Sequence, residues 1–599
     1  MTNKFSSAFD LFRGLVRLSR FRRPKQNQFL SIGIFIEQNA VQHADSVMIV
    51  TRDGEFTWAQ FNKRANQYAR YFKFQGLKSG ESLALLLENT PEMLAAFVGI
   101  CKLGAVAGLI NTSLRHEQLL HCINTVGGGR IAFGQDCINA VGQIRQELAG
   151  DDFFYIPGDT ENPSLEELSG WACPIEAVLS EQSTDNLEET QKIKCAAPAY
   201  YIFTSGTTGL PKAAILTHWH WHLASSSFST SLLGLKPSDR IYVCLPLFHT
   251  AAMFIGFGAS IMAGSSFYLT KKFSTTRFWD EVRYSHSNIF LYIGELCRYL
   301  LNSPVETDDA DNPLTTCIGN GLQPEIWDKF KSRFGIEKVA EYYGSTEGNV
   351  AFMNIFNRNS TFGFGLGKFK VVKYDIDAGD VTRDDKGYCL PTAMGETGLL
   401  ITVISKKAPF RGYTDAASTN DKILHNIFEQ GDKYVNTGDL IRRVDVGFTL
   451  GLPHYQFVDR IGDSFRWKGE NISTGEVTEL LNNIPGVKSS CVYGVAIANT
   501  DGRAGMAAMI IDDDFFSLDI FSQAVSESLT PSARPIFIRI ISELDVTDTY
   551  KIKKILLQKE AYKIDEVEDP LFVRMPVSDK YCELDAELYR DIQSGKLGF

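Results

Sequence analysis

Apolar residues in the first 360 positions form short continuous runs that are separated by longer amphipathic stretches. The runs at 82–88 (SLALLLE), 241–245 and 266–269 are typical of buried strands, and 91–103, after an Asn-Thr-Pro start, is typical of a helix. Strands that alternate with helices favour parallel pairing. The pattern therefore predicts an α/β fold with layered, largely parallel sheets in this region.

The hydrophobic pattern changes twice further along the chain. From about 363 to 450 it consists of short strands and turns, such as 398–404. Beyond 460, a helix near 475–482 and a strand near 490–495 indicate a compact mixed unit. We predict three parts: a basic segment at 1–30, a large domain at 31–461 and a smaller domain at 462–599.

Length and composition narrow the class of protein. A chain of 599 residues is too long for one hydrophobic core, so more than one domain is expected. The net charge of -11 argues against general nucleic-acid binding, and the 11 cysteines show no zinc-ligand spacing. Free thiols and the lack of an apolar secretory signal predict a cytoplasmic location.

The N-terminal segment adds a possible contact with a membrane. One face of a predicted helix there is apolar, formed by Phe5, Ala8, Phe9, Phe12, Leu15 and Val16. Positive charge lies nearby, on Arg13, Arg17, Arg20, Arg22, Arg23 and Lys25. A helix of this kind can lie on an anionic membrane surface, but a short docking helix or a disordered basic tail has the same pattern.

Two further apolar stretches, at 93–110 and 251–269, raise the question of a membrane span. Lys102 interrupts the first stretch, whereas the second carries no charge and is long enough to cross a bilayer. Three glycines in the second stretch favour a buried helix that is followed by a strand.

A segment of small residues, TSGTTGLPK, follows the apolar run at 200–203. Its glycines let backbone amides approach an anion closely, its hydroxyls are donors, and its lysine adds positive charge. The residues predicted to hold a polyphosphate are Thr204, Ser205, Gly206, Thr207, Thr208, Gly209 and Lys212. The spacing differs from the GxxxxGKS/T motif of P-loop NTPases, and a flexible turn is the alternative interpretation.

At this string the chain resembles the adenylate-forming superfamily, which includes acyl-CoA synthetases, beetle-type luciferases and the adenylation domains of peptide synthetases. EYYGSTE at 341–347 resembles the YGxTE motif of that superfamily. The resemblance implies that Tyr343 stacks on adenine, that Thr346 bonds phosphate or carboxylate oxygens, and that Glu347 binds Mg²⁺. A polar surface turn is the alternative when this string is taken alone.

Two shorter strings fit the same resemblance. PLFH at 246–249 resembles the motif whose histidine, here His249, lies beside the acyl carboxylate. Gly319, Asn320 and Gly321 resemble the small-residue segment that makes room for the flat adenine base. Each string alone has an ordinary structural explanation, a structural histidine and a simple turn.

The resemblance continues towards the C-terminus. Asp439, in TGD, and Arg460, in DRIGD, match residues that reach the ribose, with a surface ion pair as the alternative. Lys551, in TDTYK, matches the adenylation lysine. A lysine that bridges a carboxylate and the α-phosphate offsets the repulsion between two anions, although a solvated basic helix is the alternative here.

Several strings resemble one subgroup, the fatty acid transport protein and very-long-chain acyl-CoA synthetase family, over about 31–560. They are FRWKGENIST at 465–474, YGSTEGN at 343–349 and LGAVA at 103–107. The resemblance implies a large adenylation domain with a small β-barrel-like subdomain, and a mobile α+β C-terminal domain. That C-terminal domain would carry the catalytic lysine, and Gly469 would leave space for the coenzyme A thiol.

The function implied is a ligase that uses ATP, Mg²⁺ and coenzyme A to convert a long- or very-long-chain fatty acid into its acyl-CoA, AMP and pyrophosphate. A ligase for another acid (bile acid, carnitine-like or aryl) and a fatty acid uptake protein with weak synthetase activity are the alternatives. The sequence predicts no oligomeric state.

Overall fold

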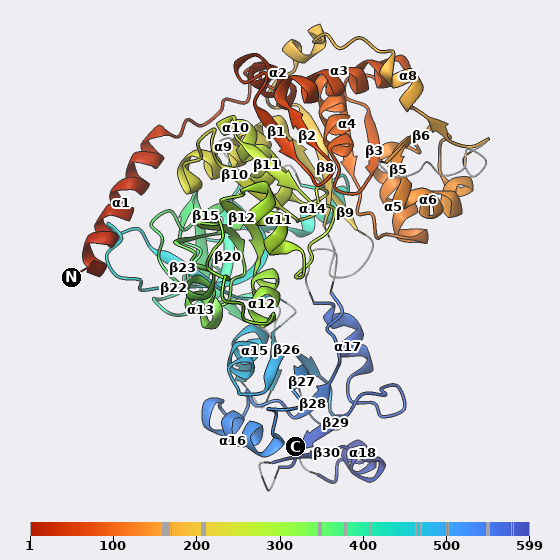
Figure 1. Ribbon diagram of the computed structural model, residues 1–599. Coiled ribbons are helices and arrows are strands. Elements are labelled where there is room, and N and C mark those ends of the chain that lie inside the picture. Colours follow the sequence, from red (N-terminus) through yellow and green to blue (C-terminus); the bar gives the residue numbers. More distant parts are fainter. Residues whose placement is uncertain are drawn as a thin grey trace.

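The computed structural model describes residues 2–158, 168, 170–204, 211–344, 350–375, 380–405, 410, 412–461, 464–467, 470–498, 500, 502–546, 552–576, 578, 580–597 and 599. Figure 1 shows a large body of sheets and helices, with the C-terminal part of the chain below it. The predicted α/β class is confirmed, because helices alternate with mostly parallel strands through the large body.

The first large sheet carries the predicted phosphate segment at one edge. Its seven strands, in spatial order, are β7 (Cys173–Pro174), β6 (Phe153–Ile156), β5 (Ile131–Gly134), β3 (Ser82–Leu86), β4 (Val106–Leu109), β8 (Pro198–Thr204) and β9 (Lys212–Thr217). All neighbours pair in parallel except β8 and β9. The chain continues from β3 into α4 (Pro91–Lys102), which confirms the predicted strand and helix.

Lys102, which interrupts the first apolar stretch, lies in the interior at the end of α4. It forms an ion pair with Glu37 of α2 (Ile32–Gln42) at 2.9 Å and is itself fully buried. Its ammonium also donates to the side chains of Asn62 and Asn66 on α3 (Trp58–Phe74), at 2.7 and 2.6 Å. The lysine therefore joins three helices, and all three of its protons have acceptors.

The second large sheet has nine strands and forms the centre of the large body. In spatial order they are β16 (Phe364–Leu366), β15 (Ala351–Met353), β14 (Lys338–Gly344), β13 (Thr316–Asn320), β12 (Ile289–Ile293), β10 (Arg240–Val243), β11 (Ser266–Leu269), β1 (Val47–Val50) and β2 (Glu55–Thr57). The six strands from β14 to β1 run parallel. Their carboxyl ends therefore share one edge, where ligands of open α/β sheets bind.

The second apolar stretch is a buried helix that is followed by a strand, as predicted. It comprises η5 (Ala252–Ala259), α10 (Ser260–Ala263) and β11. The η5 turn is π-helical, a wider form that the apolar pattern does not distinguish from an α-helix. Within the described residues, none of the helices combines the length and apolar composition needed to cross a bilayer.

The subdomain expected to be barrel-like is an open sheet in the part of the chain that the structure describes. It contains β17 (Phe369–Val372), β20 (Thr397–Val403), β22 (Lys433–Val444), β21 (Ile423–His425) and β23 (His454–Arg460). β22 is long enough to pair with both β21 and β23 along one side, while β17 ends the order on the other. Since β17 pairs with neither β21 nor β23 among the described residues, the sheet does not close.

Residues after Ile461 build a separate hydrophobic core. Five strands form its sheet: β26 (Val487–Val495), β27 (Ala504–Ile511), β28 (Phe537–Ile540), β29 (Leu571–Arg574) and β30 (Tyr581–Glu583). The sheet is mixed, with only β27 and β28 parallel. The helices described in this part of the chain are α15 (Thr474–Asn482), α16 (Leu518–Ser528), α17 (Lys554–Glu560) and α18 (Ala586–Gln593). The helix predicted near 475–482 lies within α15, and the strand predicted near 490–495 lies within β26.

The N-terminal helix α1 (Thr2–Arg20) packs on the large body (Figure 1). Leu11 is buried, and a Cβ atom at Gly14 would lie only 2.8 Å from the Phe356 ring, so the helix approaches closely there. Arg17 donates to the carbonyl oxygen of Leu232, at the end of η4 (Ser227–Leu233). The docking-helix interpretation therefore describes the inner face of α1, while Phe12 on the outer face is 65% exposed.

Candidate active site

The predicted phosphate segment connects the two antiparallel strands β8 and β9. Thr204 and Lys212 are direct partners across this pair, so β8 and β9 form a hairpin whose connecting residues, 205–210, lie outside the described residues. The base of the hairpin is held by α5 (His116–Gly127), where His121 Nε2 lies 3.0 Å from the Pro211 carbonyl oxygen. A P-loop would instead lead from a strand into a helix, so the structure agrees with the exclusion of that motif.

His249 lies on the carboxyl side of β10, at the start of η5. Its carbonyl accepts a hydrogen bond from the amide of Met253 at 3.2 Å. The segment before it is fixed by Asn89, whose side chain donates to the Leu245 carbonyl at 2.9 Å and accepts from the Leu247 amide at 2.8 Å. Asn89 also bonds the Thr270 carbonyl after β11, so it joins both large sheets at their carboxyl edges. Sequence reasoning missed Asn89, because an asparagine before a helix usually has a local role.

The Gly319–Gly321 segment ends β13 and turns sharply. Gly321 has a φ of 81°, in the left-handed region, and Asn320 and Gly321 face outwards. Behind the turn, the buried carboxyl group of Glu341 accepts from the Leu322 amide and the Tyr292 hydroxyl, both at 2.8 Å. Burial raises the pKa of Glu341 to about 8. Glu341 was also missed, since its position in EYYGSTE carries no chemical signal of its own.

Tyr343, Asp439 and Arg460 come together from two sheets. The Tyr343 hydroxyl donates to Asp439 Oδ2 at 2.6 Å, and Arg460 Nε donates to Asp439 Oδ1 at 3.1 Å. Burial and the Asp439 carboxylate raise the pKa of Tyr343 well above its ordinary value, so this hydroxyl stays a donor. Asp439 is only 4% exposed, whereas the Arg460 side chain is 54% exposed, so the ion pair considered from the sequence is present and is buried on its carboxylate side.

Asp459, the residue before Arg460, connects β23 to the C-terminal unit. Its carboxylate accepts from the amide of Thr474 at 2.8 Å, at the start of α15, and from the hydroxyl of Ser464 at 3.0 Å. A second link is the ion pair between Arg442 and Glu476 at 2.8 Å. In the DRIGD string the sequence predicts a role for Arg460 only. The role of Asp459 depends on contacts with Ser464 and Thr474 that the sequence alone does not reveal.

Nine predicted site residues lie outside the described residues. They are Ser205, Gly206, Thr207, Thr208, Gly209, Thr346, Glu347, Gly469 and Lys551. A bridge between Val546 and Ile552 brackets the segment that contains Lys551. Two of the lysines near it are engaged within the C-terminal unit, Lys553 with Asp545 and Lys554 with the Thr474 hydroxyl. In the part of the chain that is described, no three metal-ligating side chains gather into a cluster.

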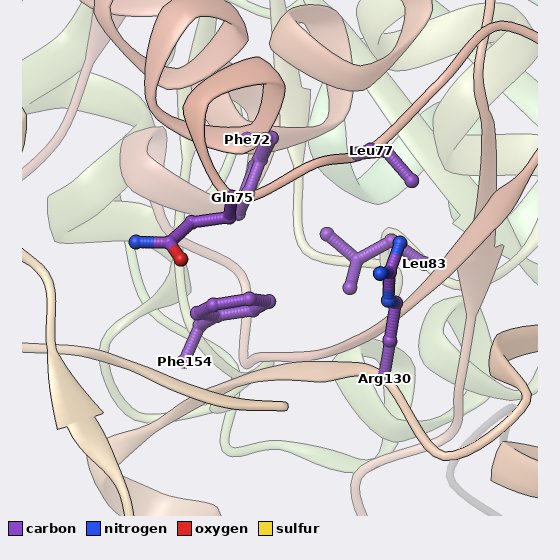
Figure 2. A pocket seen from close by; sticks show the side chains of 6 residues that line it. All are labelled: Phe72, Gln75, Leu77, Leu83, Arg130 and Phe154. Carbon is purple, nitrogen blue, oxygen red and sulfur yellow. The ribbon is translucent and has the colours of Figure 1, made fainter. Parts of the chain in front are cut away.

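A surface depression away from these residues is too small to hold a ligand. Phe72, Gln75, Leu77, Leu83, Arg130 and Phe154 line it, as Figure 2 shows, and it has no room for a water-sized sphere. It lies beside the amino end of β3, whereas Thr204, Asn320 and Tyr343 lie at the carboxyl ends of their strands. The depression therefore plays no part in the candidate site.

Comparisons with known proteins place these features in a family. Residues 36–390 match the family model described as AMP-binding enzyme. The chain is 36% identical over 576 residues to the medium/long-chain-fatty-acid–CoA ligase FadD6 of Mycobacterium tuberculosis, covering 96% of this chain and 92% of the relative. It is 35% identical to long-chain fatty acid transport protein 1 of Homo sapiens, covering 90% of this chain and 83% of that protein.

Solved structures agree on the fold. The anthranilate CoA ligase AuaEII in complex with anthranoyl-AMP superposes with a TM-score of 0.75 at 22% identity, over 90% of this chain and 98% of that one. A benzoate CoA ligase from Burkholderia xenovorans LB400 superposes with a TM-score of 0.73 at 18% identity, over 88% and 100%.

Proposed function

The chain belongs to the AMP-binding enzyme family, and we propose that this AMP-forming acyl-CoA synthetase acts on long- or very-long-chain fatty acids. The observation that carries the proposal is the meeting of Tyr343, Asp439 and Arg460 at the carboxyl edge of the large sheet, which supports the buried Asp439 carboxylate as an acceptor for a nucleotide. The names of the relatives at 36% and 35% identity support a fatty acid as the substrate.

In the first half-reaction, a carboxylate oxygen of the fatty acid attacks the α-phosphorus of ATP. A P–O bond forms, the bond to the β-phosphate bridge breaks, and pyrophosphate leaves with its electrons. Mg²⁺ enters as part of the MgATP substrate and offsets phosphate charge. We assign Lys212 and the residues between β8 and β9 to binding of the departing pyrophosphate, and Asp439 to accepting hydrogen bonds from the ribose hydroxyls. We assign Lys551 to neutralising the fatty acid carboxylate and the α-phosphate while the bond between them forms.

In the second half-reaction, the coenzyme A thiolate attacks the acyl carbonyl carbon and AMP leaves. The C-terminal unit would rotate between the two half-reactions. This rotation would withdraw Lys551 from the adenylate and bring Gly469 to the place where the coenzyme A thiol enters. The bonds from Asp459 to Thr474 and from Arg442 to Glu476 hold the arrangement seen here. A rotation of the C-terminal unit would break these bonds and others between the two parts, such as the bond from Asn302 to the Lys488 carbonyl, but it would leave the separate core of the unit intact.

The test is ATP–pyrophosphate exchange together with release of AMP that depends on fatty acid and coenzyme A. Lys551→Ala should abolish exchange, whereas Lys553→Ala, a change two residues away at a lysine paired with Asp545, should leave it near the wild-type rate. Unchanged exchange in Lys551→Ala refutes that assignment. A series of saturated acids of increasing length, with benzoate and a bile acid beside them, identifies the substrate; AMP release with an aryl acid alone contradicts the fatty acid proposal.

We also propose that the outer face of α1 contacts an anionic membrane. Phe12 and Leu15 are exposed on it beside Arg13 and Arg20. The exposed Phe448, on the loop between β22 and β23, belongs to the same region. Its carbonyl accepts from the side chain of Arg358, and the preceding Asn357 donates to Asp10 of α1. Exposed apolar side chains next to arginines suit a lipid surface that carries negative charge.

Co-sedimentation with vesicles tests the membrane contact. Binding should require phosphatidylserine in the vesicles and should weaken in the double variant Phe12→Ser with Leu15→Ser. As a matched control, Phe74→Ser changes a phenylalanine that is similarly exposed, 74% against 65% for Phe12, but that lies on α3. Equal sedimentation of all three proteins with neutral and anionic vesicles contradicts the proposal.

A further inference from the structure

A buried carboxyl group lies directly behind the turn at 319–322. Glu341, on β14, is only 5% exposed. One of its oxygens accepts from both the Leu322 amide and the Tyr292 hydroxyl, at 2.8 Å each. Since Asn320 and Gly321 face outwards, the carboxyl group holds the turn from the interior of the sheet.

The turn has almost no room to move on its inner side. A Cβ atom at Gly294 would approach the Gly321 carbonyl oxygen to 1.7 Å, and one at Gly319 would approach the Tyr292 carbonyl oxygen to 2.2 Å. The backbone after β13 is therefore packed against the backbone that ends β12. The position of the Leu322 amide decides where the outward face of the turn lies.

The charge state of Glu341 suits this place. Burial raises its pKa to about 8, so at neutral pH the group is mostly protonated and adds little negative charge behind a site for a polyanion. A protonated carboxyl group has nearly the shape of a glutamine amide, with one acceptor oxygen on the side of Leu322 and Tyr292.

We propose that Glu341 is a positioning residue for the purine ring of ATP: its bond to the Leu322 amide sets how closely the base packs against the backbone of 319–321. Because Glu341 is 5% exposed and lies behind the turn, its effect on the base is exerted through the turn. The proposal rests on the proposed function, because it takes the turn as one wall of the adenine site.

The test compares Glu341→Gln with Glu341→Leu. Glutamine keeps the acceptor oxygen, so its KM for ATP should stay within about threefold of the wild type. Leucine leaves a buried amide and hydroxyl without an acceptor, so the turn should shift and the KM for ATP should rise by about tenfold or more, with kcat and the KM for fatty acid changed far less.

The same kind of buried pair elsewhere in the sheet provides a matched control. Tyr242, on β10, donates to Glu281 of α11 (Phe278–Ser285) at 2.8 Å, and Glu281 is 4% exposed. Glu281→Leu should lower the thermal midpoint of unfolding as Glu341→Leu does. It should leave the KM for ATP unchanged, because Glu281 does not hold the 319–321 segment that is proposed to border the adenine base.

Calorimetric titration of AMP into each protein separates this proposal from the proposed function. Wild-type protein that binds no AMP and releases none from ATP contradicts the proposed function itself. Wild-type protein that binds AMP, with Glu341→Leu binding equally well, overturns the positioning role. A loss of AMP affinity that is as large in Glu281→Leu as in Glu341→Leu also overturns the positioning role, because the loss would then result from general destabilisation of the sheet.

Discussion

Replacing Asp439 by asparagine tests the centre of the candidate site, because it keeps the shape of the side chain and removes its charge. The Tyr343 hydroxyl would then bond a neutral group, and the difference between charged and neutral acceptors is about 1–1.5 kcal/mol. The ion pair with Arg460 adds at most about 1 kcal/mol, because solvent screens an arginine that is 54% exposed. We expect the free energy of unfolding to fall by about 2 kcal/mol.

The effect on the nucleotide should be larger and more specific. Asparagine offers one acceptor oxygen where aspartate offers two, so one ribose hydroxyl loses a charged acceptor worth about 1.5–3 kcal/mol. The KM for ATP should therefore rise by about 10- to 100-fold in the pyrophosphate-exchange assay. The KM for fatty acid should change little, because the acyl chain makes no use of this carboxylate.

Asp432 supplies the control for this experiment. It lies just before β22, in the same sheet, and accepts from the amides of Ile427, Phe428 and Glu429 at 2.6, 2.9 and 3.1 Å. Asp432→Asn should lower stability without raising the KM for ATP. A KM for ATP within about threefold of the wild type in Asp439→Asn, despite the lower stability, would falsify the ribose assignment.

Three further changes test other parts of the structure. Asn89→Ala should lower the exchange rate about 10- to 100-fold by displacing the segment before His249, which single-turnover kinetics measures; a wild-type rate contradicts that positioning. Lys102→Met leaves the buried Glu37 carboxylate unpaired and should cost about 3–5 kcal/mol of stability in urea unfolding, part of which returns in the double variant with Glu37→Gln. Burial and Arg17 lower the pKa of Lys338 to about 7, so the folded state releases this proton before the unfolded state does. Stability should then rise with pH between about 7 and 10.5, and Lys338→Met should remove that part of the slope.

The sequence predicts most of the elements that carry the site, because their signals are local. The apolar run at 266–269 coincides with β11, and the strand predicted over 82–88 is β3, Ser82–Leu86. The helix predicted from Pro91 begins there because the Thr90 hydroxyl accepts a hydrogen bond from the Met93 amide. This N-terminal cap is predicted by the Asn-Thr-Pro string. Each of these signals depends on neighbours within a few positions.

What the sequence does not predict depends on partners far away in the chain. Whether the sheet around β22 closes depends on its edges, and the open edge of β17 has no local signature. Asn89 bonds a carbonyl 156 positions away. Glu341 and Asp459 appear in recognisable strings, yet their roles come from the buried amides that they accept, at Leu322 and Thr474. Carboxylates and amides in such strings are usually solvated, so the interior contacts become visible only in the fold.

The adjacency of Asp459 and Arg460 links the nucleotide site to the C-terminal unit. Side chains of successive strand residues point to opposite faces, so two neighbours on β23 serve two different partners. Arg460 bonds Asp439, the carboxylate assigned to the ribose, while Asp459 bonds Thr474 at the start of α15. A ribose hydroxyl bound to Asp439 would share that carboxylate with the guanidinium of Arg460, because each carboxylate oxygen can accept more than one hydrogen bond. Two successive residues at the end of β23 therefore connect the carboxylate assigned to the ribose with the C-terminal unit, whose sequence contains Lys551.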